Sequence, residues 1–277
     1  MLANLLITFR ETLEAGLIIG ITLSVLSKLE QRKSFTSVYW GIFLGVLTSA
    51  IGAFFFHQFA GGFEGKSEKI FEGVIMLVGA ACITTLIAWV SHQKSIIENL
   101  KNSLTELSIQ PKQLGVFLIV YTAILREGIE TILFLNASLY ATQGNGFLGA
   151  FLGLILGILV TTLLFRSTLR VSIQQVFKLS NTLLILFAAG LVAHGVHELQ
   201  EAHVIPTLIQ EVWNTNPIVT SGGYPLLHEK GLIGSFLKGL FGYNGNPTLL
   251  EVSSYAVYLS AIIVFTRRSR TEKQASS

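Results

Sequence analysis

Apolar residues fill long runs of this chain, and short polar stretches separate one run from the next. Each run is long enough to cross roughly 30 Å of hydrocarbon as an α-helix that rises about 1.5 Å per residue. We therefore expect an all-α, multi-pass membrane protein with seven transmembrane helices. The predicted helices cover residues 2–27, 36–60, 69–90, 113–140, 146–166, 179–200 and 249–266.

The composition agrees with this pattern. Of the 277 residues, 51% are hydrophobic and 13% are charged, whereas soluble domains carry about 25% charged residues. We expect the first run to be retained, not cleaved as a signal peptide, because it lacks a basic start and contains Arg10, Glu11 and Glu14. The single cysteine, Cys82, lies inside the third predicted helix, so the chain offers no disulfide framework of its own.

The basic residues fall mostly on one side of the predicted helices. Following the alternation of the helices, 13 of the 19 Lys and Arg residues lie in the loops and tail of one side, and four lie on the other. Because cytoplasmic loops are enriched in Lys and Arg, we expect the N-terminus outside and the C-terminus in the cytoplasm. The expected location is the cytoplasmic membrane. This sorting accounts for the net charge of +3, so the charge does not indicate a nucleic-acid partner.

A charged motif interrupts the first and the fourth predicted helix. RETLE at 10–14 and REGIE at 126–130 place one arginine and two glutamates at the same spacing, 116 residues apart. These two helices cross the membrane in opposite directions, so we interpret the first six helices as a 3+3 inverted repeat, a plan that many secondary transporters use. The predicted organisation is a first repeat at 1–112, a second at 113–202, an extracytoplasmic loop at 203–248, and a seventh helix with a basic tail at 249–277.

The four motif glutamates share one layer near the middle of the membrane, because helix rise puts them about 14 to 20 Å from the outer ends of their helices. They are Glu11, Glu14, Glu127 and Glu130. Inserting a charged residue at this depth costs about 2.5–3.5 kcal/mol, so a purely structural role for these salt bridges is disfavoured. Carboxylate oxygens are hard ligands. We therefore interpret the glutamates as a metal-cation site in which the arginine of each motif limits their mutual repulsion.

The paired motif resembles the hallmark of the high-affinity iron permease family, an Arg-Glu-Gly-Leu-Glu sequence in the first and fourth spans. This family includes oxidase-coupled yeast permeases and bacterial relatives that take up ferrous or ferric iron. Thr12 replaces the usual glycine and Ile129 the leucine, and neither change alters a charged position. Three other stretches also resemble the family: FEGVIML around Glu72, HELQEA at 197–202 and GLFGYNGNPTLLEV at 239–252.

The resemblance implies an iron importer and not an enzyme, with iron as the transported substrate and no permanently bound cofactor. It gives the iron-handling role to the four motif glutamates and makes Arg10 and Arg126 members of the motif. It also implies an extracytoplasmic partner that delivers or oxidises the iron. The oxidation state of the transported iron, the energy source and the oligomeric state stay open.

More polar residues lie at the outer end of the sixth predicted helix. His194, His197, Glu198 and Glu201 recur at helical spacings, and the repeat places them opposite Glu72. We expect the three glutamates of this set to form a metal relay at the outer mouth; the alternative is an ordinary helix end whose polar residues reach water. The two core motifs sum to a formal charge of −2, so a ferric ion would need another acid. Glu72, Glu198 or a bound hydroxide are the candidates.

Two further patterns concern packing. Gly149, Gly153 and Gly157 lie at every fourth position, a spacing that lets helices approach closely within the bundle or in a homo-oligomer. In the outer loop, the sequence at 231–243 predicts a short helix that lies in the membrane interface or re-enters the membrane. Such a helix would cover the outer mouth or receive the partner, and the alternative is a packed loop.

Two other functions use the same acids. Di-iron enzymes in helical bundles pair glutamates with a histidine three residues later, but Leu17 and Leu133 stand at those positions after Glu14 and Glu130. This difference counts against a membrane-embedded carboxylate metalloenzyme. A carrier for another divalent cation, or a proton-coupled carrier of a cationic solute, remains as the second alternative.

Overall fold

The fold is built from long helices. The computed structural model describes residues 2–92, 113–142, 146–166, 173–217 and 224–275. In these ranges the chain forms seven long α-helices, one short α-helix and a 3₁₀ turn at Arg32–Ser34, and no strand. The long helices are α1 (Leu2–Lys28), α2 (Phe35–Ala60), α3 (Lys66–His92), α5 (Gln113–Thr142), α6 (Phe147–Phe165), α7 (Ile173–Glu201) and α9 (Leu249–Ala275). The short one is α8 (Leu232–Phe241).

The expectation of an all-α protein is confirmed, and each predicted span coincides with a long helix. Helices α7 and α9 are longer than the apolar runs that predicted them, because α7 begins six residues before its run and α9 continues past the end of its run. By length and composition, three described segments have the character of a membrane span: Arg32–Ala60, Phe147–Phe165 and Leu179–Glu201. Leu249–Phe265 is apolar but shorter. Helices α1 and α5 each carry three motif charges, which lowers their mean hydropathy.

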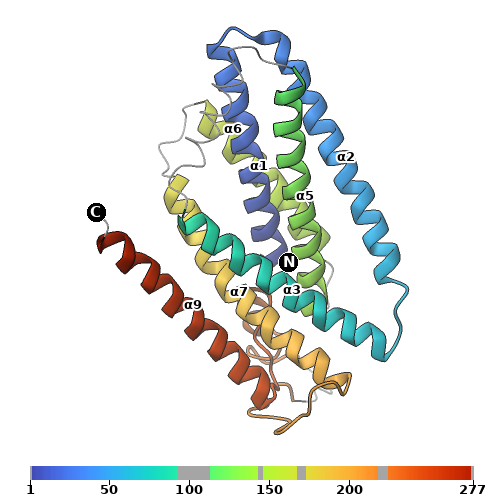
Figure 1. Cartoon of the computed structure of the whole chain (residues 1–277). Helices are drawn as coiled ribbons and strands as arrows, with labels where there is room; N and C mark the ends of the chain where they lie inside the picture. The colour runs from blue at the N-terminus through green and yellow to red at the C-terminus, as the bar shows by residue number, and fades with distance from the viewer. Residues whose placement is uncertain (1, 93–112, 143–145, 167–172, 218–223, 276–277) are drawn as a thin grey trace.

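The helices pack in pairs. Helix α1 lies along α6, α2 along α5, and α3 along α7, while α9 packs on the far side of α7 (Figure 1). Helices α1 and α5 also contact each other. A core between α1, α3, α5 and α7 holds buried side chains from all four helices, including Ile7, Met76, Phe134 and Leu191. The two motif-bearing helices are therefore anchored on both sides.

Glycines set the close approach of two of these pairs. All three glycines of the α6 series are buried, and Gly153 and Gly157 face α1. A Cβ added to Gly153 would lie 2.9 Å from the backbone nitrogen of Phe9 and closer still to the carbonyl oxygen of Leu5. On α2, a Cβ added to Gly45 would lie 2.8 Å from the Cβ of Ile124 in α5. The predicted glycine series thus packs within the bundle.

The contact between α3 and α7 is reciprocal. A Cβ added to Gly73 would lie 3.0 Å from the carbonyl oxygen of Gly195, and a Cβ added to Gly195 would lie 3.0 Å from the carbonyl oxygen of Gly73. The residue four positions after each glycine repeats the pattern, because Leu199 meets Gly73 and Leu77 meets Gly195. Two helices that exchange identical contacts in this way are locally related by a two-fold axis.

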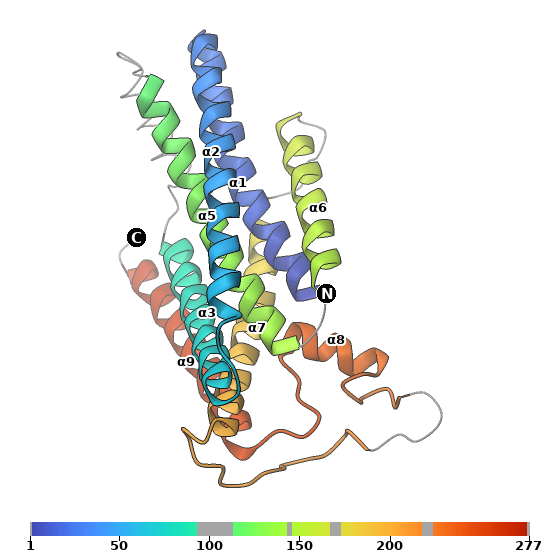
Figure 2. The same ribbon diagram turned by 90° about the vertical axis from the view of Figure 1, so that its right-hand side faces the viewer.

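The segment between α7 and α9 is folded against the helices. Its ends are tied together by backbone hydrogen bonds, including Thr215 N to Gly245 O at 2.7 Å. Helix α8 contacts α7 and the start of α1, and it lies across the ends of the long helices in Figure 2. It ends at Gly242 in the left-handed conformation, and a Cβ added to Gly190 of α7 would lie 2.5 Å from the Gly242 Cα.

Glu229 organises this segment. Its carboxylate accepts hydrogen bonds from Lys238 Nζ at 2.6 Å, Asn216 Nδ2 at 2.8 Å and the backbone nitrogen of Gly245 at 2.9 Å. Burial of the carboxylate raises its pKa, but these donors, led by Lys238, outweigh burial and hold the pKa of Glu229 at about 2. The segment predicted as a short helix forms α8 and is held by this hydrogen-bonded structure.

Candidate metal site

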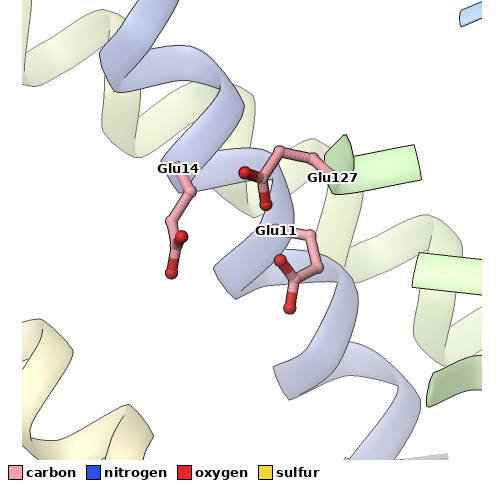
Figure 3. A group of neighbouring side chains, drawn as sticks. All are labelled: Glu11, Glu14 and Glu127. Carbon is pink, nitrogen blue, oxygen red and sulfur yellow. The ribbon is translucent and has the colours of Figure 1, made fainter. Parts of the chain in front are cut away.

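The contact between α1 and α5 brings the two motifs together. Potential ligand atoms of Glu11, Glu14 and Glu127 all lie within 4.8 Å of one another (Figure 3). Among the described residues, this is the one group of three or more metal-ligating side chains that converges so closely. The fourth predicted ligand, Glu130, is not in the group; its Oε1 lies 3.4 Å from Nε of Arg126.

Both motif arginines form ion pairs with these glutamates. Arg10 lies 2.6 Å from Oε1 of Glu11 and 2.7 Å from Oε1 of Glu14, both on its own helix. Arg126 lies 2.6 Å from Oε1 of Glu127, and its Nη2 is also 3.9 Å from Oε2 of Glu14. The arginines therefore limit the repulsion among the four acids. Together, the four glutamates and two arginines carry a formal net charge of −2.

The site still contains carboxylate oxygens without a hydrogen-bond partner. The Oε2 atoms of Glu11, Glu127 and Glu130 are buried and accept no hydrogen bond. A buried polar atom left in this state costs about 1–3 kcal/mol, and more if it is charged. Oxygen donors of this kind are what hard metal ions prefer, so a bound cation would satisfy them.

A cavity reaches the first glutamate of each motif. It has a volume of about 1120 Å³, lies between α1, α2, α5 and α6, and is lined by Glu11 and Glu127. Toward one end it is lined by Asn136 and Leu139, and toward the other by Ser27. Glu11 and Glu127 thus lie at the wall of a cavity that runs along much of the helix length.

The departure of the first motif from the family pattern has a packing counterpart. A Cβ added to Gly157 of α6 would lie 2.6 Å from the Cβ of Thr12, so Thr12 faces a glycine. In the second copy the sizes are exchanged, because Gly128 of α5 faces Ser49 of α2. At each motif, a glycine on one helix therefore faces a larger residue on the other helix. Thr12 is accommodated because its partner, Gly157, has no side chain.

The acids predicted for the relay lie apart from the motif glutamates, where α3 contacts α7. Lys69 Nζ lies 3.0 Å from Oε2 of Glu198 and also pairs with Glu201, linking α3 to α7. Nδ1 of His197 lies 2.8 Å from Oε1 of Glu251, and Nε2 lies 3.1 Å from Oε1 of Glu201.

The two remaining candidates lie close to these residues on α3 and α7. His194 Nδ1 lies 3.0 Å from the carbonyl oxygen of Gly190, in its own helix. Glu72 is half-buried, three residues beyond Lys69. The relay of Glu72, Glu198 and Glu201 stays a prediction. In the structure, Lys69 pairs with two of these three acids.

Sequence reasoning missed Lys69 and Glu251. Lys69 is one of the four basic residues that the sequence places on the less basic side. Glu251 is buried at the start of α9, where Oε1 accepts a hydrogen bond from Thr248 N at 2.9 Å while Thr248 Oγ1 accepts one from Glu251 N at 3.2 Å. This reciprocal pattern is the capping box that the sequence Thr-x-x-Glu indicates, so a signal for Glu251 was present.

The chain is similar to one known protein family and to individual proteins over most of its length. The model of the iron permease FTR1 family matches residues 1–271. A protein named ferrous iron permease EfeU from Yersinia pestis is 32% identical over 271 residues, covering 96% of this chain and 93% of that protein. One of the same name from Escherichia coli O6:H1 is 28% identical over 288 residues, covering 100% and 99%. No solved structure gave a significant match.

Proposed function

Because this chain belongs to the iron permease FTR1 family, we propose that it imports iron through a carboxylate site formed by its two Arg-Glu-x-x-Glu motifs. The chain is a transporter and not an enzyme, so iron is its substrate. The observation that carries the proposal is the convergence of Glu11, Glu14 and Glu127 from two helices, with buried oxygens that lack hydrogen-bond partners.

The pairing of helices supports an inverted repeat. If the repeat relates α1, α2 and α3 to α5, α6 and α7, the contact of α1 with α6 must have a counterpart between α5 and α2. The contact of α3 with α7 must be its own counterpart. All of these contacts are present, and the reciprocal glycine contact lies where the axis would pass. Side-chain exposure of the glutamates follows the same relation, at 3% and 4% for Glu11 and Glu127 and 13% and 15% for Glu14 and Glu130.

We further propose the route and the setting. The protein spans the cytoplasmic membrane with seven helices, its N-terminus outside. Iron delivered or oxidised by an extracytoplasmic partner enters past the outer cluster of Glu72, Glu198 and Glu201, and then reaches the motif glutamates. Displacement of Lys69 from Glu198 and Glu201 would free two of these acids on the way in.

The test is uptake by the purified protein in liposomes. Radiolabelled iron, manganese and zinc are supplied to wild type, Glu14→Gln, Glu127→Gln and Glu130→Gln, with Glu64→Gln as a matched control at an exposed glutamate between α2 and α3. We expect the motif variants to lose iron uptake and the control to keep it. Iron uptake that survives the motif substitutions would refute the proposal, and preferred uptake of manganese or zinc would favour a carrier for another divalent cation.

A further inference from the structure

The two motif arginines differ although the glutamates around them do not. Exposure is closely matched within each pair of corresponding glutamates, but the side chain of Arg10 is 2% exposed and that of Arg126 is 43% exposed. The difference is large for residues at the same position of the same motif. It indicates that the two guanidinium groups have different tasks.

The ion pairs of the two arginines also differ. Arg10 pairs with the two glutamates of its own motif, at one and four residues along α1. Arg126 pairs with its own glutamates and also approaches Glu14 of the other motif, and among the ion pairs of the described residues it alone joins the motifs. Glu14 and Glu127 are two of the three converging ligands. The Arg126 guanidinium therefore uses carboxylates that a metal ion at this site would also need.

Building on the proposed function, we propose that Arg126 is a built-in cation that leaves the motif carboxylates when iron binds, whereas Arg10 is a fixed counter-ion. Arg126 can move because its side chain is partly exposed. Arg10 is enclosed, and removing a buried charge from its partners strongly destabilises a fold. The proposal makes Arg126 a residue that determines which ion charge the site accepts.

The charge balance gives the proposal a quantitative form. With both arginines in place, the four glutamates and two arginines carry −2, which matches a divalent ion. With Arg126 withdrawn, the remaining groups carry −3, which matches a trivalent ion. Movement of one side chain thus supplies the additional negative charge that a ferric ion needs, without a further acid.

Substitution of Arg126 should therefore strengthen metal binding instead of weakening it. Coulomb repulsion between the guanidinium and the ion scales with the charge of the ion. If Arg126→Gln tightens binding of Mn²⁺ by about tenfold, binding of Ga³⁺ should tighten by more than about tenfold, because the trivalent ion is the one that must displace the guanidinium in wild type. Both ions resist redox change under the assay conditions, so binding can be measured apart from transport.

The experiment measures dissociation constants of Mn²⁺ and citrate-buffered Ga³⁺ for the purified full chain in detergent. Arg126→Lys, which keeps the positive charge, serves as the matched variant and should tighten metal binding less than Arg126→Gln does. Arg10→Gln should lose folded protein or metal binding. Gel filtration and an apparent melting temperature establish that Arg126→Gln is folded.

Several outcomes would overturn the inference. Weaker or unchanged metal binding by folded Arg126→Gln would contradict it, and so would equal gains for the two ions. An Arg126→Gln protein that does not fold would contradict it as well, because the proposal requires the fold to tolerate departure of this side chain. A wild-type protein that binds neither ion at the motif would instead refute the proposed function itself.

Discussion

Gly128 offers a direct test of how the second motif is held. It lies next to Glu127 on α5 and faces Ser49 of α2. In Gly128→Ala, the new Cβ would lie 2.5 Å from the Cβ of Ser49 and closer still to its Oγ. Rotation of the hydroxyl cannot relieve the contact with the Ser49 Cβ, which is attached to the backbone. Helix α5 must therefore move away from α2, and Glu127 moves with it.

The expected cost follows from the size of this clash. Overpacking by one or a few methylenes costs about 1–3 kcal/mol, and the better helix propensity of alanine offsets at most about 1 kcal/mol. Gly128→Ala should thus lower stability. The double variant Ser49→Gly, Gly128→Ala reproduces the arrangement of the first motif, in which Thr12 faces Gly157. We expect it to recover most of the loss, with a coupling energy of about 0.5–3 kcal/mol.

The measurement is the apparent melting temperature in detergent together with iron uptake in liposomes. Gly52→Ala is the matched control on α2, because the nearest atom to its added Cβ is 4.0 Å away, an ordinary contact. Gly128→Ala should lower both readouts, the double variant should restore both, and Gly52→Ala should leave both unchanged. A tolerated Gly128→Ala, or a double variant no better than the single one, would refute the packing argument.

Two further predictions concern the segment between α7 and α9. The pKa of Glu229 lies below its unfolded value of about 4.3, so its stabilisation is present above that pH and is lost as the pH falls toward about 2. The hydrogen-exchange protection factors of residues 212–217 and 224–245, which correct for the intrinsic effect of pH, should therefore fall over this range in wild type, whereas in Glu229→Gln they should be low already at neutral pH. Thr248→Ala should weaken the start of α9 by about 0.5–2 kcal/mol, the usual cost of losing an N-cap side chain, as a lower apparent melting temperature would show; Ser253→Ala, at an exposed position, is its control.

Much of the fold and the centre of the site follow from the sequence, because they depend on chain-local rules. Apolar runs of fixed length predict helices, and a repeated motif predicts that two helices bring like residues to the same depth. The convergence of Glu11, Glu14 and Glu127 needed only that α1 and α5 contact each other. These inferences do not depend on the details of side-chain packing.

What the sequence could not reveal depends on those details. The motifs are identical at Arg10 and Arg126, so their difference in exposure arises from the helices packed around each, not from the motif itself. The exclusion of Glu130 from the closest group has the same origin. Lys69 could not be paired with Glu198 from sequence, because the pair is 129 residues apart and rests on the close α3–α7 contact.

The reciprocal contact of Gly73 with Gly195 has a consequence for how such a chain can arise. Two separate copies of one three-helix polypeptide, inserted in opposite directions, would make this contact as a symmetric homodimer. The last helix of one copy would then end on the same side of the membrane as the first helix of the other begins. Gene duplication and fusion would need only to join those ends, and the ancestral dimer interface would survive inside a single protein.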